Sequence, residues 1–228
     1  MSEEKHAKPK TIAIIGGTGK EGKGLAYRWC KAGYRIIIGS RQLEKAQAAV
    51  EDVLLLAEEH VHLSGMTNPE AAEQADLVVL TVPYSVHCEM LEALKPYLKG
   101  KILVDVTVPL VPPKVTKVQM PPEGSASMQA QAILGEDTQV VAAFQNISYE
   151  KLLNNEEVEC DVLVCGKGKS AREVVLELVR DAGLVGWDAG PLENAVVVEG
   201  MTSILIGLNK QFGVQSAGIR ITGVPRPF

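Results

Sequence analysis

The chain has 228 residues, of which 46% are hydrophobic, so it can bury a sizeable core in one large domain or in a domain with a small lobe. Its net charge of -5 offers no basic surface of the kind that neutralises a nucleic-acid backbone. Its apolar runs are all shorter than the roughly 18 residues of a membrane span. We therefore expect neither nucleic acid nor a membrane as a partner.

The N-terminal residues 1–10 are mostly polar and lack the apolar centre of a signal peptide, so they are expected to form a disordered tail. The four cysteines have neither the spacing of metal ligands nor that of a disulfide framework. They are therefore expected to be reduced, mostly buried thiols in a cytoplasmic protein that holds no metal. These cysteines are Cys30, Cys88, Cys160 and Cys165.

An apolar run over residues 11–15 leads directly into glycines at Gly17, Gly19 and Gly22, and a helical pattern follows. This order predicts a strand, a tight turn and a helix, in which the first glycine permits the turn. The second lets a pyrophosphate approach the backbone, the third lets the helix pack closely, and the N–H groups at the helix end hold the phosphates. A glycine-rich turn in an ordinary strand–helix unit is the alternative, but the position at the start of the fold favours dinucleotide binding.

A second strand is predicted over residues 34–39, and the residues that follow it favour one dinucleotide over the other. NAD-binding folds carry an acidic residue at this place, which binds the ribose 2′-hydroxyl. Here Ser40 and Arg41 stand instead, and Lys45 shares a helix face with Arg41. A hydroxyl donor and two cations suit a 2′-phosphate, so the pattern indicates NADP. The alternative is a pair of solvated surface cations.

Strands and helices continue to alternate to residue 107, which predicts a doubly wound parallel sheet. Helices are expected over residues 44–60, 68–76 and 85–98, and strands over residues 61–65, 77–83 and 101–107. Ligands of such sheets bind outside the carboxyl ends of the strands. We therefore expect residues 81–84 to lie beside the cofactor and Val108 with Pro109 to close over its nicotinamide half.

The second half of the chain begins with the proline-rich residues 109–124, which form either a linker or a loop over the active site. Further helices are expected over residues 125–134, 170–182 and 191–212, and further strands over residues 140–144, 160–166 and 186–190. The last helix is apolar around most of its circumference, so we expect it to be buried against the sheet or a second subunit.

The joint set of motifs resembles the NADPH-dependent reductases of coenzyme F(420), over nearly the whole chain. The matching stretches are Ile14-Ile-Gly-Gly-Thr-Gly-x-x-Gly-Lys-Gly-Leu25, Gly39-Ser-Arg41 with Lys45, Leu80-Thr-Val-Pro83, Asp161-Val-x-Val-Cys-Gly166, Asp188-Ala-Gly-Pro-Leu192 and Gly218-Ile-Arg220. The resemblance implies a Rossmann domain over residues 11–124 and a small C-terminal α/β lobe over residues 125–228, which serves the substrate and dimerisation. It also implies a homodimeric oxidoreductase that passes a hydride between NADP(H) and the 8-hydroxy-5-deazaflavin of F(420).

The resemblance also assigns residues to each part of the site. Those implied to contact the pyrophosphate are Thr18, Gly19, Lys20 and Glu21; those implied to hold the 2′-phosphate are Ser40, Arg41 and Lys45. Those implied to line the nicotinamide and the adjoining deazaflavin site are Val82, Tyr84, Val108, Tyr149 and Ala217. One stretch departs from the family pattern, since Gln145-Asn-Ile-Ser148 stands where His-Thr-x-Pro is expected. The departure leaves two alternatives, an NADPH-dependent reductase of another small imine, ketone or flavin-like acceptor, and a non-catalytic NADP-sensing protein.

No side chain in the sequence is a compelling proton donor, and we assign no catalytic residue. His87 reads as a half-exposed residue on an amphipathic helix, and Lys210 as a solvated cation near a helix end. Tyr84 and Tyr149 read as packing residues with solvated hydroxyls. Carbonyl or imine reduction usually needs a positioned acid, whereas hydride transfer between two rings needs mainly stacking and orientation. The sequence therefore favours transfer between two rings.

Overall fold

The computed structural model describes residues 9–57, 61–153 and 157–227. Most of the predicted N-terminal tail, together with residues 58–60 of the helix expected over 44–60, lies outside these ranges. The described end of the tail is bonded to the fold, because the backbone N–H groups of Lys10 and Thr11 both donate to the Asp76 carboxylate at 2.9 Å.

Eight strands form one sheet in the order β3-β2-β1-β4-β5-β6-β7-β8. They are β1 (Thr11–Ile15), β2 (Arg35–Ser40), β3 (Leu63–Thr67), β4 (Leu77–Leu80), β5 (Ile102–Asp105), β6 (Gln139–Ala142), β7 (Asp161–Gly166) and β8 (Val185–Asp188). All neighbouring strands are parallel except β6 and β7, which pair antiparallel through two residue pairs. This arrangement confirms the predicted doubly wound sheet.

The reversal between β6 and β7 was not predicted. A parallel return needs a crossover that is usually a full helix. The link here contains the single turn α6 (Tyr149–Leu152), so β7 returns in the opposite direction. The sheet continues across the domain boundary predicted at residue 124, because β5, which precedes this residue, pairs with β6, which follows it. The division into a domain and a lobe at that residue stays a prediction.

The other helices follow the predicted pattern with local differences. They are α1 (Lys20–Lys31), α2 (Leu43–Leu54), α3 (Asn68–Gln74), α4 (His87–Leu94), α5 (Ala126–Leu134), α7 (Lys169–Asp181) and α8 (Ala195–Phe212). The helix expected from residue 44 to residue 60 ends at Leu54, where the consecutive Leu54, Leu55 and Leu56 are exposed and continue no apolar stripe. Thr67 caps α3 through a capping box with Glu70.

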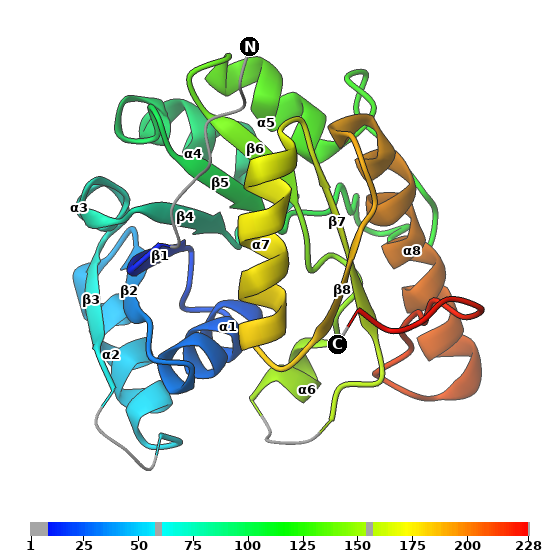
Figure 1. Ribbon diagram of the computed structural model, residues 1–228, viewed down its shortest axis with the longest axis horizontal. Helices are drawn as coiled ribbons and strands as arrows, with labels where there is room; N and C mark the ends of the chain where they lie inside the picture. The colour runs from blue at the N-terminus through cyan, green and yellow to red at the C-terminus, as the bar shows by residue number, and fades with distance from the viewer. Residues whose placement is uncertain (1–8, 58–60, 154–156, 228) are drawn as a thin grey trace.

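The helices cover both faces of the sheet (Figure 1). Alternate strand residues point to opposite faces, so that Ile12 and Ile14 join one core and Ala13 and Ile15 the other. The first core contains buried residues of α1, α2, α6 and α7, and the second contains buried residues of α3, α4, α5 and the start of α8. Within the described residues, no helix is long and apolar enough to cross a bilayer.

The C-terminal segment lies beside α8 at the end of the molecule away from β3 (Figure 1). The backbone N–H of Ala217 donates to Asn209 Oδ1 at 2.8 Å, and Ile219 accepts from the backbone N–H of Asp161 at 2.8 Å. The Asp161 carboxylate is buried and accepts from Ile221 N and Trp187 Nε1, each at 2.8 Å. Strand β7 therefore holds the segment against the fold.

All four cysteines are free thiols, as expected. Cys30, Cys160 and Cys165 are buried, whereas Cys88 is exposed on α4. Burial raises the pKa of Cys30 to about 12 and that of Cys165 to about 11, so neither thiol is reactive at neutral pH. In the described parts of the chain, no group of histidines, cysteines and carboxylates could hold a metal ion.

Candidate active site

The turn after β1 is built from glycines because three of its positions admit no side chain. Gly16 has a φ of +68°, in the left-handed region, and a Cβ on it would lie 2.7 Å from Val82 Cγ1. A Cβ on Gly17 would lie 2.7 Å from the Ile14 carbonyl oxygen, and one on Gly22 would lie 2.5 Å from Gly17 Cα. The close contact of Gly22 brings the first turn of α1 against the loop. The left-handed residue is Gly16, one position before the glycine that we expected to permit the turn.

Gly19 differs from these glycines because it faces open space. It is the N-cap residue of α1, and a Cβ placed on it would meet no atom within 4 Å. Thr18, Gly19 and Glu21 line a cavity of about 860 Å³. The free N–H groups at the start of α1 thus face a space that can take an anion.

Two ionisable side chains flank this helix end. Lys20 is not among the residues that line the cavity, and its Nζ lies 3.2 Å from Glu150 and 5.0 Å from the centre of the Tyr149 ring. Burial raises the pKa of the Glu21 carboxyl to about 8, so this side chain is largely neutral at pH 7. A neutral Glu21 removes the charge repulsion that an ionised carboxylate would impose on a nearby phosphate.

A second cavity of about 520 Å³ lies past the end of β2. Ser40, Arg41 and Lys45 all line it. Ser40 is buried and its Oγ accepts from the backbone N–H of Gln42 at 3.3 Å, which leaves its hydroxyl hydrogen free to be donated. Arg41 and Lys45 are exposed at the cavity, so two positive charges face the same space.

The two cavities are parts of one cleft over the carboxyl ends of the parallel strands. They share five lining residues, which are Gly16, Thr18, Thr81, Val82 and Pro83. The residues that the resemblance places at the nicotinamide and deazaflavin all line the larger cavity; they are Val82, Tyr84, Val108, Tyr149 and Ala217. The proline-rich stretch contributes Leu110, Pro112 and Val115 to its wall, so that stretch is a loop over the cleft rather than a linker.

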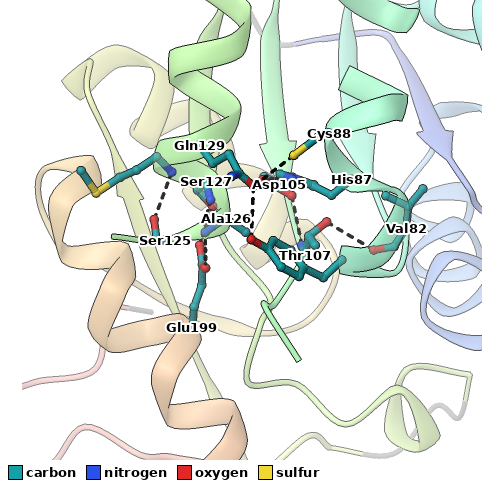
Figure 2. A network of polar contacts seen from close by, with 12 residues as sticks. Val82, His87, Cys88, Asp105, Thr107, Ser125, Ala126, Ser127, Gln129 and Glu199 are labelled. Atoms are coloured by element: carbon teal, nitrogen blue, oxygen red, sulfur yellow. Dashed lines mark hydrogen bonds and ion pairs between the residues drawn. The ribbon is translucent and has the colours of Figure 1, made fainter. Parts of the chain in front are cut away.

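Figure 2 shows a buried histidine–aspartate pair, His87 and Asp105, near Thr107 and Val82, which line the larger cavity. His87 Nε2 lies 2.8 Å from Asp105 Oδ2, and both side chains are 0% exposed. The other carboxylate oxygen accepts from the backbone N–H of Thr107 at 3.1 Å, and the Thr107 hydroxyl donates to the Val82 carbonyl at 3.4 Å. The prediction of a half-exposed His87 is wrong, because α4 turns this residue inward toward the end of β5.

Glu199 is a further buried acid, and we did not predict it from the sequence (Figure 2). Its carboxylate accepts from the backbone N–H groups of Ala126 at 2.7 Å and Ser127 at 3.0 Å, and from Ser127 Oγ at 2.8 Å. It thus caps the first turn of α5 from the neighbouring α8. Burial raises the pKa of Glu199 to about 7 despite these three donors. A single acid within an apolar helix was the signal that could have revealed it.

Of the described residues that line the larger cavity, the ionisable ones are Glu21, Tyr84 and Tyr149. The Tyr84 hydroxyl donates to Gln129 Oε1 at 3.4 Å, and burial raises the pKa of this hydroxyl above its ordinary value. Tyr149 is 41% exposed and packs under Lys20. Lys210 is exposed in the last turn of α8 and does not line the cavity. The described walls of the larger cavity are thus mostly apolar and carry few ionisable groups.

The strand order, the glycine turn and the two cations beyond β2 together define a dinucleotide-binding oxidoreductase of the Rossmann class. A family model described as NADP oxidoreductase, coenzyme F(420)-dependent, matches residues 11–109. The F(420)-dependent NADP reductase of Methanothermobacter thermautotrophicus is 43% identical over 94% of this chain and 95% of that protein. The chain belongs to the family of F(420)-dependent NADP reductases.

Two further comparisons agree with this family. The F(420)-dependent NADP reductase of Methanocaldococcus jannaschii is 40% identical over 93% of this chain and 98% of that protein. A crystal structure of a putative F(420)-dependent NADP reductase from Arthrobacter sp. FB24 has a TM-score of 0.77 with 24% identity, over 94% of this chain and 99% of that one. The resemblance seen in the motifs is therefore confirmed, and the solved structure shows that the fold is shared.

Proposed function

We propose that this protein transfers a hydride between NADP(H) and the deazaflavin coenzyme F(420). The observation that carries the proposal is the single cleft, which joins a cavity with two cations to a wider cavity with apolar walls. The wider cavity, at about 860 Å³, has room for a nicotinamide and a second broad ring system. The relatives described above are F(420)-dependent NADP reductases, in agreement with this reading.

The residues present fit NADP along its length. Gly19 leaves open space at the start of α1 for the pyrophosphate, and Arg41 with Lys45 would pair with the 2′-phosphate. Val82 and Val108 would hold the nicotinamide between the ends of β4 and β5. When bound, NADPH supplies the hydride. The protein then acts by holding two flat rings in contact and by keeping water out with apolar walls.

The departure at Gln145-Asn-Ile-Ser148 keeps a small imine or ketone as a second candidate substrate. The size of the cavity and the relatives favour the deazaflavin. To test this, purified protein is mixed with NADPH and F(420), and the deazaflavin absorbance is followed over time. We expect the absorbance to fall as the ring is reduced. Tight NADPH binding without any change in absorbance would refute the proposal. If the protein also failed to reduce a panel of imines and ketones, the remaining alternative would be a non-catalytic NADP sensor.

We further propose that residues 125–228 serve the second substrate and form a homodimer. Helix α8 lines the wider cavity with Thr202, Leu205, Ile206 and Asn209. Another face of α8 carries exposed apolar side chains at helical spacing; they are Val197, Ile204, Leu208 and Phe212. Such a stripe on a long helix suits a second copy of the chain. We expect Ile204→Glu to convert a dimer into a monomer in sedimentation velocity, and a monomeric wild type would refute the proposal.

We propose the cytoplasm as its location. The support is the cysteine chemistry, since all four thiols are free and three of them are buried. Such unpaired thiols suit a reducing compartment. Fractionation of cells and detection of the protein by antibody would test this, and recovery from the cell surface would contradict it.

A further inference from the structure

Two neighbouring strands, β4 and β5, are each followed by a segment that enters the wall of the wider cavity. Val82 follows β4, Thr107 and Val108 follow β5, and all three line the cavity. In the described chain, the last backbone hydrogen bond between the two segments runs from Val106 N to the Leu80 carbonyl at 3.1 Å. Any hydrogen bond that joins the segments beyond this point therefore involves a side chain.

Two side-chain contacts make this connection (Figure 2). The Thr107 hydroxyl donates to the Val82 carbonyl at 3.4 Å. His87 is the first residue of α4, which follows the β4 segment, and its Nε2 lies 2.8 Å from Oδ2 of Asp105, the last residue of β5. The other carboxylate oxygen of Asp105 accepts from the backbone N–H of Thr107 at 3.1 Å. The Asp105 carboxylate is thus bonded toward both segments at once.

The His87–Asp105 pair is closed off from solvent. Both side chains are 0% exposed, so water does not compete for their hydrogen bond. Because a carboxylate only accepts, the ring hydrogen lies on His87 Nε2, and the other ring nitrogen, Nδ1, is buried without a partner among the described residues. Apolar side chains of the same volume often stabilise a fold as well or better. What such a pair adds is a single enforced geometry.

That geometry matters at the nicotinamide. Val82 and Val108 would hold this ring between them, so the separation of the two segments decides how closely the ring is confined. Hydride transfer needs the two reacting carbons in near contact, and a misplacement of about 1 Å can lower the rate roughly a hundredfold. The pyrophosphate and the 2′-phosphate would bind at other parts of the cleft. A change at the pair should therefore disturb the ring more than the affinity for the dinucleotide.

We propose that His87 and Asp105 are positioning residues for the hydride transfer, which hold the segments after β4 and β5 at the separation that fits the nicotinamide. The inference rests on the proposed function. Both side chains are buried and neither lines the cavity, so they act through Val82, Thr107 and Val108 and not by contact with the cofactor.

The test separates the hydrogen bond from the mere presence of a polar side chain. Gln carries its Nε2 the same number of bonds from the backbone as His does, so His87→Gln can keep the bond to Asp105. Asn carries its amide one bond closer to the backbone, so His87→Asn is too short to make that bond. Tyr34→Phe is the matched control. It removes the 2.6 Å hydrogen bond from buried Tyr34 to the Asp181 carboxylate, and Tyr34 precedes β2 at the end of the strands opposite to the cleft.

Three quantities are measured on each variant once circular dichroism has shown that it is folded. The fluorescence lifetime of bound NADPH reports how closely its nicotinamide is confined and needs no second substrate. The single-turnover rate of NADPH oxidation by F(420) reports the hydride step, and titration gives the Kd for NADPH. In His87→Asn we expect a shorter lifetime and a rate that is about ten- to a hundredfold lower, with a Kd that changes less than about threefold.

The other two variants show whether the hydrogen bond is the cause. We expect His87→Gln to recover most of the lifetime and of the rate, and Tyr34→Phe to keep the wild-type values of both even where its thermal stability is lower. Wild-type lifetime and rate in folded His87→Asn would overturn the proposal and assign the pair to stability. Equal losses in His87→Gln and His87→Asn would also overturn it, because the bond to Asp105 would then not be the cause.

A further variant decides the matter if His87→Asn does not fold. Thr107→Val removes the hydroxyl bond to Val82 and keeps both the shape of the side chain and the backbone bond to Asp105. We expect a shorter NADPH lifetime in this variant, and a wild-type lifetime would overturn the proposal. If wild type does not reduce F(420), the proposed function fails, whereas the lifetimes still test the positioning of the nicotinamide.

Discussion

Arg41→Ala tests how the protein distinguishes NADPH from NADH. Arg41 and Lys45 are exposed at the smaller cavity, and Ser40, the last residue of β2, lines the same cavity. The guanidinium can pair with a 2′-phosphate through two parallel hydrogen bonds. NADH carries no phosphate at this position, so the substitution should change its affinity very little.

The size of the effect follows from the exposure of the site. A hydrogen bond to a charged group contributes about 1.5–3 kcal/mol when it is well shielded from solvent. Arg41 is exposed and Lys45 remains in the variant, so screening and the second cation reduce this to about 1–2 kcal/mol. We therefore expect the Kd for NADPH to rise roughly 5–30-fold and that for NADH to change by less than about threefold.

The assay is calorimetric titration of both dinucleotides at low and high salt. Added salt should narrow the difference between wild type and variant for NADPH, because the lost contact is ionic. Arg35→Ala is the matched control, since it removes the same charge from the opposite end of the same strand β2. It should leave both constants unchanged. Equal weakening of NADPH and NADH by Arg41→Ala would refute the assignment of Arg41 to the 2′-phosphate.

Three further predictions concern the turn and the buried acids. Gly22→Ala places a Cβ 2.5 Å from Gly17 Cα and should lower the free energy of unfolding in urea by about 1–3 kcal/mol. Gly19→Ala places its Cβ in open space, so this variant should keep the wild-type stability and lose NADPH affinity. Equal stability of Gly22→Ala and wild type would contradict the packing argument. The pKa of Glu21 is about 8, so the NADPH affinity of wild type should fall above pH 8 as this carboxyl ionises, and that of Glu21→Gln should stay level. Parallel pH profiles for the two proteins would show that the charge of Glu21 does not affect NADPH binding. The pKa of Glu199, raised to about 7, means that the folded state binds its proton more tightly than the unfolded state. The free energy of unfolding should therefore fall by about 2–3 kcal/mol between pH 4.5 and pH 7 through this group, and Glu199→Gln should flatten that slope in urea denaturation; an unchanged slope would show that Glu199 does not titrate there.

The sequence predicted the parts of the molecule that depend on local pattern. The glycine turn is one example, because the spacing of Gly17, Gly19 and Gly22 reflects contacts within one strand–helix unit. The residues Ser40 and Arg41 are another, since their place relative to the turn is set by the length of α1 and β2. The alternation of strand and helix gave the parallel sheet for the same reason.

The parts that could not be predicted depend on the relative position of distant elements. Hydrophobic pattern carries no strand direction, so the reversal of β7 was not visible in it. We expected His87 at the surface because the residues of its own helix do not indicate its buried partner Asp105, which lies on the next strand of the chain, β5. The available signal was Asp105 itself, since a carboxylate that ends a fully apolar strand is buried and needs a partner.

These buried groups explain how α8 keeps its place over the cleft. Strand β6 contacts β7 through two residue pairs, so the backbone alone ties the C-terminal strands weakly to the rest of the sheet. Apolar packing in the two cores adds further links, and two polar side chains fix α8 itself: Glu199 caps α5, and Asn146 bonds the Val198 carbonyl of α8. Buried polar contacts give less stability than apolar packing of the same volume, but they accept one geometry. We infer that the wall facing the second substrate is positioned by these contacts, because hydride transfer requires two rings to meet in one orientation.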